Sequence, residues 1–388
     1  MQGLTMSRMI LSRALSLLIL LLFAGPVLAA RAPVPAPPPV SAASYIVIAN
    51  STGKVIAAKN PDKRHAPASL TKMMVLYITF GDLKSGTIHL SDKVTVSKKA
   101  WQTGGSRMFI RVGHKVSVRK LIEGIIVDSG NDATVALSQY VAGSTSGMVS
   151  LMNQNAGQLG MDHTHYADVD GLPHPDHYST ARDLATLARA IINDYPKYYK
   201  EFFAQKELTW NGIKQYNRNK LLWRSDDVDG LKTGHTEAAG YCLVSSAQRD
   251  GMRLIAAVLD SRGEEGRIND SQALLNYGFR FYETHRLYAA EKPLTRARVW
   301  KGKKQRVGVG LRQPLYVTIP RGRYKSLKAM TSIKPDLTAP ISPDTQVGTV
   351  KVSLDGKVLA QRPLYPLQPV PQGGLLRRMF DSVRLMFQ

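Results

Sequence analysis

The pattern of apolar residues changes at about His285, and this change constrains the fold more than any other feature of the sequence. Before it, runs with helical periodicity such as 70–80 alternate with short strand-like runs such as 43–49. After it come only short alternating runs, among them 348–354, which the hairpin turn Asp355-Gly356 follows. A period near 3.6 indicates helices and a period of 2 indicates strands. We therefore expect a mixed α+β domain followed by a small all-β sandwich domain.

The N-terminus has the order of a secretory signal peptide. Two arginines flank the start of the apolar run 14–24, which is too short to span a bilayer. Small residues follow, and we expect cleavage after Ala29 or Ala30, with an uncleaved signal anchor as the alternative. Residues 30–42 then form a proline-rich spacer without a core-forming pattern.

The charge of the chain is strongly positive and unevenly distributed. Lysine and arginine number 52 against 29 acidic residues, a formal net charge of +23. Residues 286–370 hold 17 of these basic residues and only 4 acids, a net charge of +13. Because an exported protein does not meet genomic DNA, we expect no nucleic-acid partner and favour an anionic bilayer or cell-wall polymer. The single cysteine, Cys242, excludes a disulfide framework and a multi-cysteine metal site.

The first motif with chemical meaning is Ser69-x-x-Lys72 at the start of the helical run 70–80. Positions i and i+3 share a helix face, so the Lys72 amine can approach the Ser69 hydroxyl. A serine is a poor nucleophile until a base takes its proton, and a desolvated lysine with a lowered pKa can be that base. Taken alone the spacing is a weak signal, and a helix cap beside a surface lysine is the alternative.

Two further motifs follow along the chain. In the S-x-N motif, Ser129 could relay a proton and Asn131 could bind a substrate amide, although a plain turn between two helices is the alternative. The K-T-G motif at 232–234 lies in a predicted strand. Its lysine and threonine suit a substrate carboxylate, and its glycine lets a ligand backbone lie against the strand.

The three motifs in this order resemble those of the penicillin-recognising serine acyltransferases. The stretches PASLTKMM, DSGNDATVAL, GLPHPDHYSTARDLA, DGLKTGHTEAAGYCLV and NYGFRFYET are similar to the low-molecular-mass D-alanyl-D-alanine carboxypeptidases of the penicillin-binding protein 5 and 6 type, serine peptidase family S11. The resemblance runs from about Ala43 to the last residue. It implies a catalytic domain of the β-lactamase/transpeptidase type, in which helices pack on an antiparallel sheet.

The resemblance also implies a reaction that needs no metal or other cofactor. Ser69 attacks the carbonyl between the two terminal D-alanines of a peptidoglycan stem peptide, and a β-lactam antibiotic enters the same route and stalls as an acyl-serine. The expected catalytic residues are Ser69, Lys72 and Ser129, and the expected substrate-binding residues are Asn131, Lys232, Thr233, Gly234, His235 and Arg267.

Class A β-lactamases share the order of the motifs and are the nearest competing class. They need a glutamate soon after S-x-N, and none occurs between Ser129 and Glu201. A β-lactamase-like hydrolase stays as an alternative, beside a catalytically weak wall-maintenance protein. A metal site in the histidine-rich segment 162–177 is disfavoured, because the segment lacks H-E-x-x-H and is full of loop residues.

The C-terminal segment GLLRRMFDSVRLMFQ places its large apolar residues on one helical stripe and its charges opposite. Such a basic amphipathic helix lies in a membrane interface, with docking on its own protein as the alternative. The resembling family is held by this tail at the outer face of the inner membrane, so we expect a periplasmic, peripherally attached protein. The expected segments are a signal peptide (1–29), the spacer (30–42), a catalytic penicillin-binding domain (43–285), a β-sandwich domain (286–370) and a membrane-anchoring helix (371–388).

Overall fold

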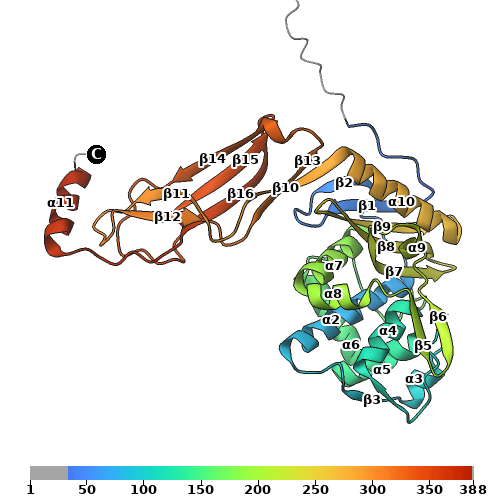
Figure 1. The fold of residues 1–388 in the computed structure, drawn as a ribbon. Helices are drawn as coiled ribbons and strands as arrows, with labels where there is room; N and C mark the ends of the chain where they lie inside the picture. The colour runs from blue at the N-terminus through green and yellow to red at the C-terminus, as the bar shows by residue number, and fades with distance from the viewer. Residues whose placement is uncertain (1–33, 387–388) are drawn as a thin grey trace, which may run out of the picture. The chain divides into compact units, whose positions relative to one another are not determined.

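Residues 34–386 of the chain are described by the computed structural model, so the expected signal peptide and its cleavage point lie outside the described residues. The first domain is built on a five-stranded antiparallel sheet in the strand order β2-β1-β9-β8-β7 (Figure 1). Its strands are β1 (Ser44–Ala49), β2 (Val55–Lys59), β7 (Val228–Thr236), β8 (Gly240–Arg249) and β9 (Met252–Ser261).

The sheet joins parts of the chain that are far apart in sequence, because β1 pairs with β9. Strands β8 and β9 follow each other through Asp250-Gly251, whose φ angles of 49° and 77° suit the tight turn of a hairpin. Strand β7 is the last in the order, so one of its edges has no strand partner within the described residues. This edge strand carries the K-T-G motif and leaves it accessible to a ligand.

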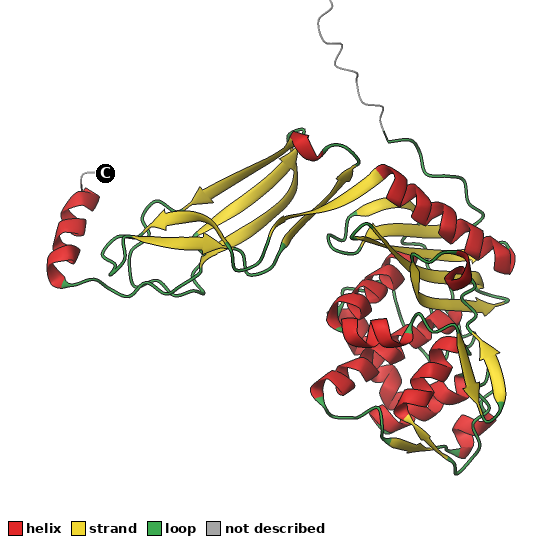
Figure 2. Ribbon diagram, in the orientation of Figure 1, coloured by secondary structure: helices red, strands yellow, loops and turns green. Residues whose placement is uncertain are grey.

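Helices cover both faces of the sheet (Figure 2). Helix α10 (Gly263–Phe281) packs on β8 and β9, and α7 (Ala181–Asp194) packs on β1 and β9 from the other side. The other helices and short strands of this domain are α2 (Lys72–Ser85), α3 (Lys98–Gln102), α4 (Val118–Val127), α5 (Asn131–Ala142), α6 (Thr145–Gln158), α8 (Pro196–Phe202), α9 (Leu221–Arg224), β3 (Lys93–Thr95), β4 (Lys115–Ser117), β5 (Glu207–Trp210) and β6 (Ile213–Tyr216).

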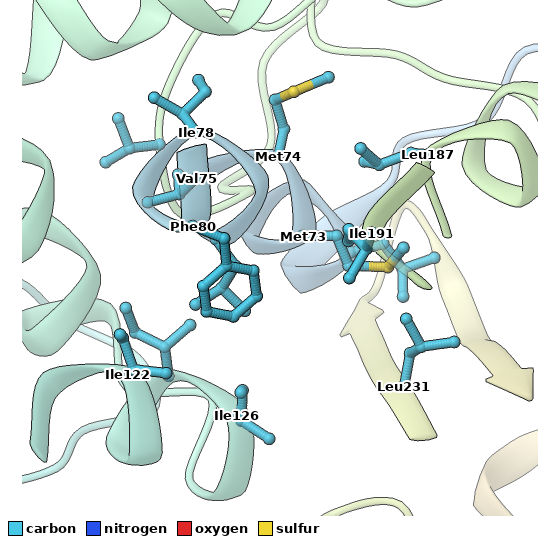
Figure 3. Packing of buried hydrophobic residues seen from close by; sticks show 14 of the residues in the cluster. Met73, Met74, Val75, Ile78, Phe80, Ile122, Ile126, Leu187, Ile191 and Leu231 are labelled. Atoms are coloured by element: carbon cyan, nitrogen blue, oxygen red, sulfur yellow. The ribbon is translucent and has the colours of Figure 1, made fainter. Parts of the chain in front are cut away.

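Helix α2 lies at the centre of the domain and contacts α5, α6 and α7. Figure 3 shows Phe80 of this helix near Ile122 and Ile126 of α4, with Met73 beside Ile191 of α7. A helix with apolar residues on every side is stable only when other elements surround it. The N-terminal end of this rigid helix therefore provides a fixed platform for Ser69 and Lys72.

The second domain is all β, as the change of pattern predicts. Strand β10 (Tyr282–Tyr288) pairs with β13 (Leu315–Pro320), and a five-stranded sheet has the order β11-β12-β16-β15-β14. Its strands are β11 (Pro293–Arg298), β12 (Arg306–Gly310), β14 (Leu327–Ile333), β15 (Gly348–Leu354) and β16 (Lys357–Pro366). Valine, leucine and isoleucine side chains of both sheets share one core, so the domain is a sandwich. Because β10 follows α10 directly, the expected domain boundary at 285/286 falls inside this strand.

Helix α11 (Leu375–Met386) ends the described chain. The Asp381 carboxylate accepts a hydrogen bond from the backbone N–H of Lys301 at 2.6 Å, so the polar side of the helix contacts the second domain. Within residues 34–386, no helix combines the length and the apolar character needed to cross a membrane.

Candidate active site

The fold brings the three motifs together from four separate elements. Ser69 lies in a 3₁₀ turn (Ala68–Thr71) directly before α2, and Lys72 is the first residue of that helix. Ser129 lies in the turn between α4 and α5, and Lys232 lies on β7. The Lys72 Nζ is 2.7 Å from the Ser69 Oγ, and the Lys232 Nζ is 2.9 Å from the Ser129 Oγ.

The hydrogen bonds around Lys72 define the direction of its lone pair. The amine donates to the Asn131 Oδ1 at 2.6 Å and to the Ser129 carbonyl oxygen at 3.0 Å. Both partners are acceptors only, so they use both N–H bonds of a neutral amine. The lone pair is then left for the Ser69 hydroxyl. In the neutral form, this arrangement leaves the Lys72 lone pair facing the Ser69 hydroxyl.

Burial tunes both lysines of the site toward the neutral form. Lys72 is fully buried, and desolvation lowers the pKa of its amine to about 7. The carboxylate of Asp170 acts in the opposite direction, whereas the charge of Arg218 adds to the effect of burial. The pKa of Lys232 lies well below its usual range, first because of burial and then because of the charge on Lys72. A base whose pKa is near neutrality is well suited to proton transfer at physiological pH.

The turn that carries the nucleophile is held in an unusual backbone conformation. Ala68 has a φ of 49° and Ser129 a φ of 58°, both in the left-handed region that side chains other than glycine rarely adopt. Two glycines approach the Ser69 turn closely, because a Cβ on Gly171 would lie 1.9 Å from the Ala68 oxygen and one on Gly234 would lie 2.8 Å from the Pro67 oxygen. Strain of this kind persists where the surrounding structure fixes the backbone.

The expected substrate-binding residues lie around this centre with different exposures. Asn131, expected to hold a substrate amide, donates from its Nδ2 to the Gly104 carbonyl oxygen at 2.7 Å and is 5% exposed. Thr233 is buried on the K-T-G strand. The exposed His235 ring lies against the Tyr241 ring, with 4.0 Å between the centroids and a tilt of 33° between the ring planes.

Arg267, expected to bind a substrate carboxylate, is almost fully buried and already has partners within the protein. It is 5% exposed, and its Nη1 donates to the Gly234 carbonyl oxygen at 3.2 Å. Its guanidinium lies over the Tyr241 ring, and Glu264 pairs with its Nη2 at 3.4 Å. Arg267 lies on α10, and its hydrogen bond to Gly234 therefore holds the K-T-G strand against this helix.

Three ionisable residues of the site were given no role by the analysis of the sequence motifs. Arg218 donates from its Nε to the Asp128 carbonyl oxygen at 3.1 Å, and it has no motif around it. Burial raises the pKa of the Asp128 carboxyl to about 7, and neither carboxyl oxygen has a hydrogen-bond partner among the described residues. Asp170 is also buried, and burial followed by the nearby Asp168 charge raises the pKa of its carboxyl to about 6.

The histidine-rich segment packs behind the nucleophile. The buried His177 Nε2 lies 2.8 Å from the Thr71 Oγ1, and its Nδ1 lies 3.4 Å from the Asp168 Oδ2. Within residues 34–386, no three histidine, cysteine or acidic side chains form a group that could hold a metal ion. His177 thus links this segment to the start of α2.

We expect the acylation rate to rise with pH through about 7, because only neutral Lys72 can accept the Ser69 proton. Between pH 8 and pH 5 the rate should fall by about tenfold to a hundredfold. Asp170→Asn removes a negative charge that raises the pKa of Lys72, so the midpoint should move to lower pH. Stopped-flow acylation with a chromogenic β-lactam measures both profiles. Asp176→Asn, at an exposed position in the same segment, is the control, and equal midpoints for both variants would contradict the assigned role of Asp170.

A serine–lysine pair at the start of a buried helix, facing an S-x-N turn and a K-T-G edge strand, defines the class of penicillin-recognising serine acyltransferases. The sequence profile described as D-alanyl-D-alanine carboxypeptidase, peptidase S11, matches residues 31–263. The profile of the penicillin-binding protein 5 C-terminal domain matches residues 282–372. The chain belongs to the D-alanyl-D-alanine carboxypeptidase family, which confirms the expectation from the motifs.

Individual relatives agree with the two profiles. The chain is 44% identical over 362 residues to the D-alanyl-D-alanine carboxypeptidase DacA of Escherichia coli, with 91% of this chain and 90% of the relative covered. It is 45% identical over 376 residues to DacC of the same organism, with 95% and 94% covered. The crystal structure of penicillin binding protein 5 from Haemophilus influenzae superposes with a TM-score of 0.82 at 40% identity, covering 87% of this chain and 100% of that one.

Proposed function

We propose that the chain is a serine-type D-alanyl-D-alanine carboxypeptidase that removes the terminal D-alanine from peptidoglycan stem pentapeptides through an acyl-serine intermediate. One observation carries this proposal more than any other. The lone pair of the buried Lys72 amine is left for the Ser69 hydroxyl 2.7 Å away, because the two N–H bonds have other acceptors. That arrangement activates a serine without a histidine or a metal ion.

In the proposed reaction, the Ser69 Oγ attacks the carbonyl between the two D-alanines while its proton passes to Lys72. Backbone N–H groups of Ser69 and of β7, which runs directly past it, stabilise the negative oxygen of the tetrahedral intermediate. The proton then moves from Lys72 through the Ser129 hydroxyl, 3.3 Å from its Nζ, to the nitrogen of the departing D-alanine. Water hydrolyses the ester and regenerates Ser69.

A hydroxyl and one cation at the far side of the site would hold the carboxylate of the peptide. Lys232 supports the Ser129 hydroxyl electrostatically, while the Thr233 hydroxyl donates to the terminal carboxylate. Arg267 contributes its positive charge from behind Gly234. A β-lactam carries a carboxylate in a similar position, so it acylates the same serine and leaves an ester that is slow to hydrolyse.

Intact-protein mass spectrometry after mixing with benzylpenicillin tests this proposal. We expect the mass of one penicillin molecule to be added to the wild-type chain and nothing to be added to Ser69→Ala. Release of D-alanine from a stem pentapeptide should disappear in the same variant. A penicillin adduct on Ser69→Ala, or a wild-type adduct without any D-alanine release, would refute the proposed activity.

We also propose that α11 anchors the protein to the outer face of the inner membrane, in the periplasm. The apolar residues of this helix face solvent, with Leu376 76%, Phe380 70% and Met386 82% exposed. Its polar side is occupied, since Asp381 accepts a hydrogen bond from the Lys301 N–H. A helix docked through its polar side leaves its apolar side for the acyl chains of a bilayer.

Truncation after Pro371 should release the protein from membranes without loss of activity. Each large apolar side chain of α11 contributes about 1.5–3 kcal/mol when fully buried, so removing the helix should lower the sedimenting fraction by at least about tenfold. Co-sedimentation with vesicles of anionic phospholipid measures this, and D-alanine release should be unchanged. Phe380→Asp should act like the truncation, whereas Ser382→Asp adds the same charge on the polar side and should retain binding. Sedimentation of the truncated chain would place the anchor elsewhere.

A further inference from the structure

A cavity whose lining contains none of the catalytic motif residues lies where the two domains meet. From Pro37 onward the chain forms one compact unit, and this cavity has a volume of about 790 Å³. The β1–β2 turn with Lys54, the loop before β13 and the beginning of β16 line it, and Arg189 of α7 adds a further side chain. Its size is typical of pockets that bind small organic ligands.

Hydrogen bonds hold several of the residues that line the cavity, and two of these bonds join the two domains. The Thr52 and Thr318 hydroxyls lie 2.8 Å apart, and the Lys54 Nζ donates to the Thr318 carbonyl oxygen at 3.1 Å. The Arg189 Nε donates to the Asn50 carbonyl oxygen at 2.7 Å. These contacts hold Lys54 and Arg189 in place but leave their positive charges without an acidic partner.

The charge of the lining is of one sign. Among the described residues that line the cavity there is no aspartate or glutamate. Five cations line it, and only Arg312 has an acidic partner, the Asp344 carboxylate just outside. Within residues 34–386, no carboxylate lies within 4.0 Å of the charged nitrogens of the remaining cations. These unpaired cations are Lys54, Arg189, Lys357 and Arg362.

The positive charges that line the cavity repel each other, as the pKa of Lys54 shows. Burial, and next the charge of Lys357, lower the pKa of the Lys54 amine, because a half-buried cation is costly without a counter-charge. A bound anion would relieve both effects. The apolar part of the lining includes Val358, Pro363 and Tyr365. The Arg312 guanidinium lies over the Tyr365 ring, 4.0 Å from its centroid.

We propose that this cavity is a binding site for a ligand that carries two or more phosphate or carboxylate groups. The four unpaired cations supply the counter-charges, and the walls built by Val358, Pro363 and Tyr365 accommodate the carbon skeleton. Binding here is independent of the acyl-serine chemistry, since none of the lining residues belongs to the three motifs. The site would give the basic second domain a specific anionic partner in addition to general attraction.

Calorimetric titration of the full chain with inorganic pyrophosphate tests this site. The double variant Lys54→Gln/Lys357→Gln should lose at least about tenfold in affinity, because two of the four unpaired charges are removed. The control Lys328→Gln/Lys351→Gln removes the same charge from exposed positions on β14 and β15 that do not line the cavity, and it should lose less than about twofold. Thermal unfolding and penicillin acylation, unchanged in both variants, show that the fold is intact.

Two results decide the proposal and the source of its ligand. Absence of pyrophosphate binding to the wild-type chain, or equal losses in the two double variants, would overturn it. If binding is found, competition with glycerol 1,3-bisphosphate, the two-phosphate headgroup of cardiolipin, separates the sources. Displacement of pyrophosphate at similar concentration assigns the site to a lipid headgroup, and failure to displace assigns it to a free polyanion.

Discussion

Replacing Lys72 with alanine should lower the rate of Ser69 acylation by at least about a thousandfold, as expected when a serine loses the base that takes its proton. Lys72 is the residue whose lone pair is left for the Ser69 hydroxyl at 2.7 Å. Lys232 cannot replace it directly, because its amine contacts the Ser129 hydroxyl instead. The rate is measured by following a fluorescent penicillin under single-turnover conditions.

The control for this experiment lies on the same helix. Lys84 is in the last turn of α2, where its exposed amine donates to the Asp194 carbonyl oxygen at 3.2 Å. Lys84→Ala should acylate at the wild-type rate. Thermal unfolding of Lys72→Ala establishes that the variant is folded. If folded Lys72→Ala acylated at a rate within tenfold of wild type, another group would have to be the base.

Gly171→Ala should have the second large effect, on stability and acylation together. Gly171 has a φ of 86°, and a Cβ there would lie 1.9 Å from the Ala68 oxygen and 3.0 Å from the Ser69 nitrogen. Neither contact is with a flexible side chain, so the backbone of the nucleophile turn must move. We expect a loss of about 2–4 kcal/mol in the free energy of unfolding and about a hundredfold in the acylation rate.

Gly160→Ala separates the steric contact from the backbone conformation. Gly160 has a φ of 71°, but nothing lies within 4 Å of a Cβ built on it. This variant should lose only about 1 kcal/mol, the cost of a left-handed residue, and should acylate normally. Urea unfolding and penicillin acylation measure both variants. Equal losses of stability would mean that Gly171 does not hold the Ser69 turn in place.

Features that depend on neighbouring residues were predictable from the sequence. The i, i+3 spacing predicts that Lys72 approaches Ser69, and the 2.7 Å contact agrees. The change of periodicity predicts the all-β second domain, and the apolar stripe predicts the helix α11. The three ordered motifs indicate the family, which the two matching profiles confirm.

Elements whose side chains face solvent gave no such signal. Strand β14 has the sequence LKAMTSI, and most of its residues are exposed because it forms the edge of the sheet. Strand β10 has the sequence YETHRLY, with four polar residues in a row, and none of its residues is fully buried. A strand without a buried face has no need for the period-2 apolar pattern by which strands are recognised.

The charges and the shape of the site were decided by tertiary structure. Lys232 reaches the Ser129 hydroxyl across 103 residues of sequence, and Arg218 reaches the Asp128 carbonyl oxygen across 90. By itself, the sequence determined the three motifs and the approach of Lys72 to Ser69, because helical spacing is a property of the chain. Only the packed structure decided the pKa of Lys72, since burial, Asp170 and Arg218 act on it from distant segments. Desolvation and electrostatic interactions depend on which groups are close in space, and the local periodicity of the sequence carries no information about that.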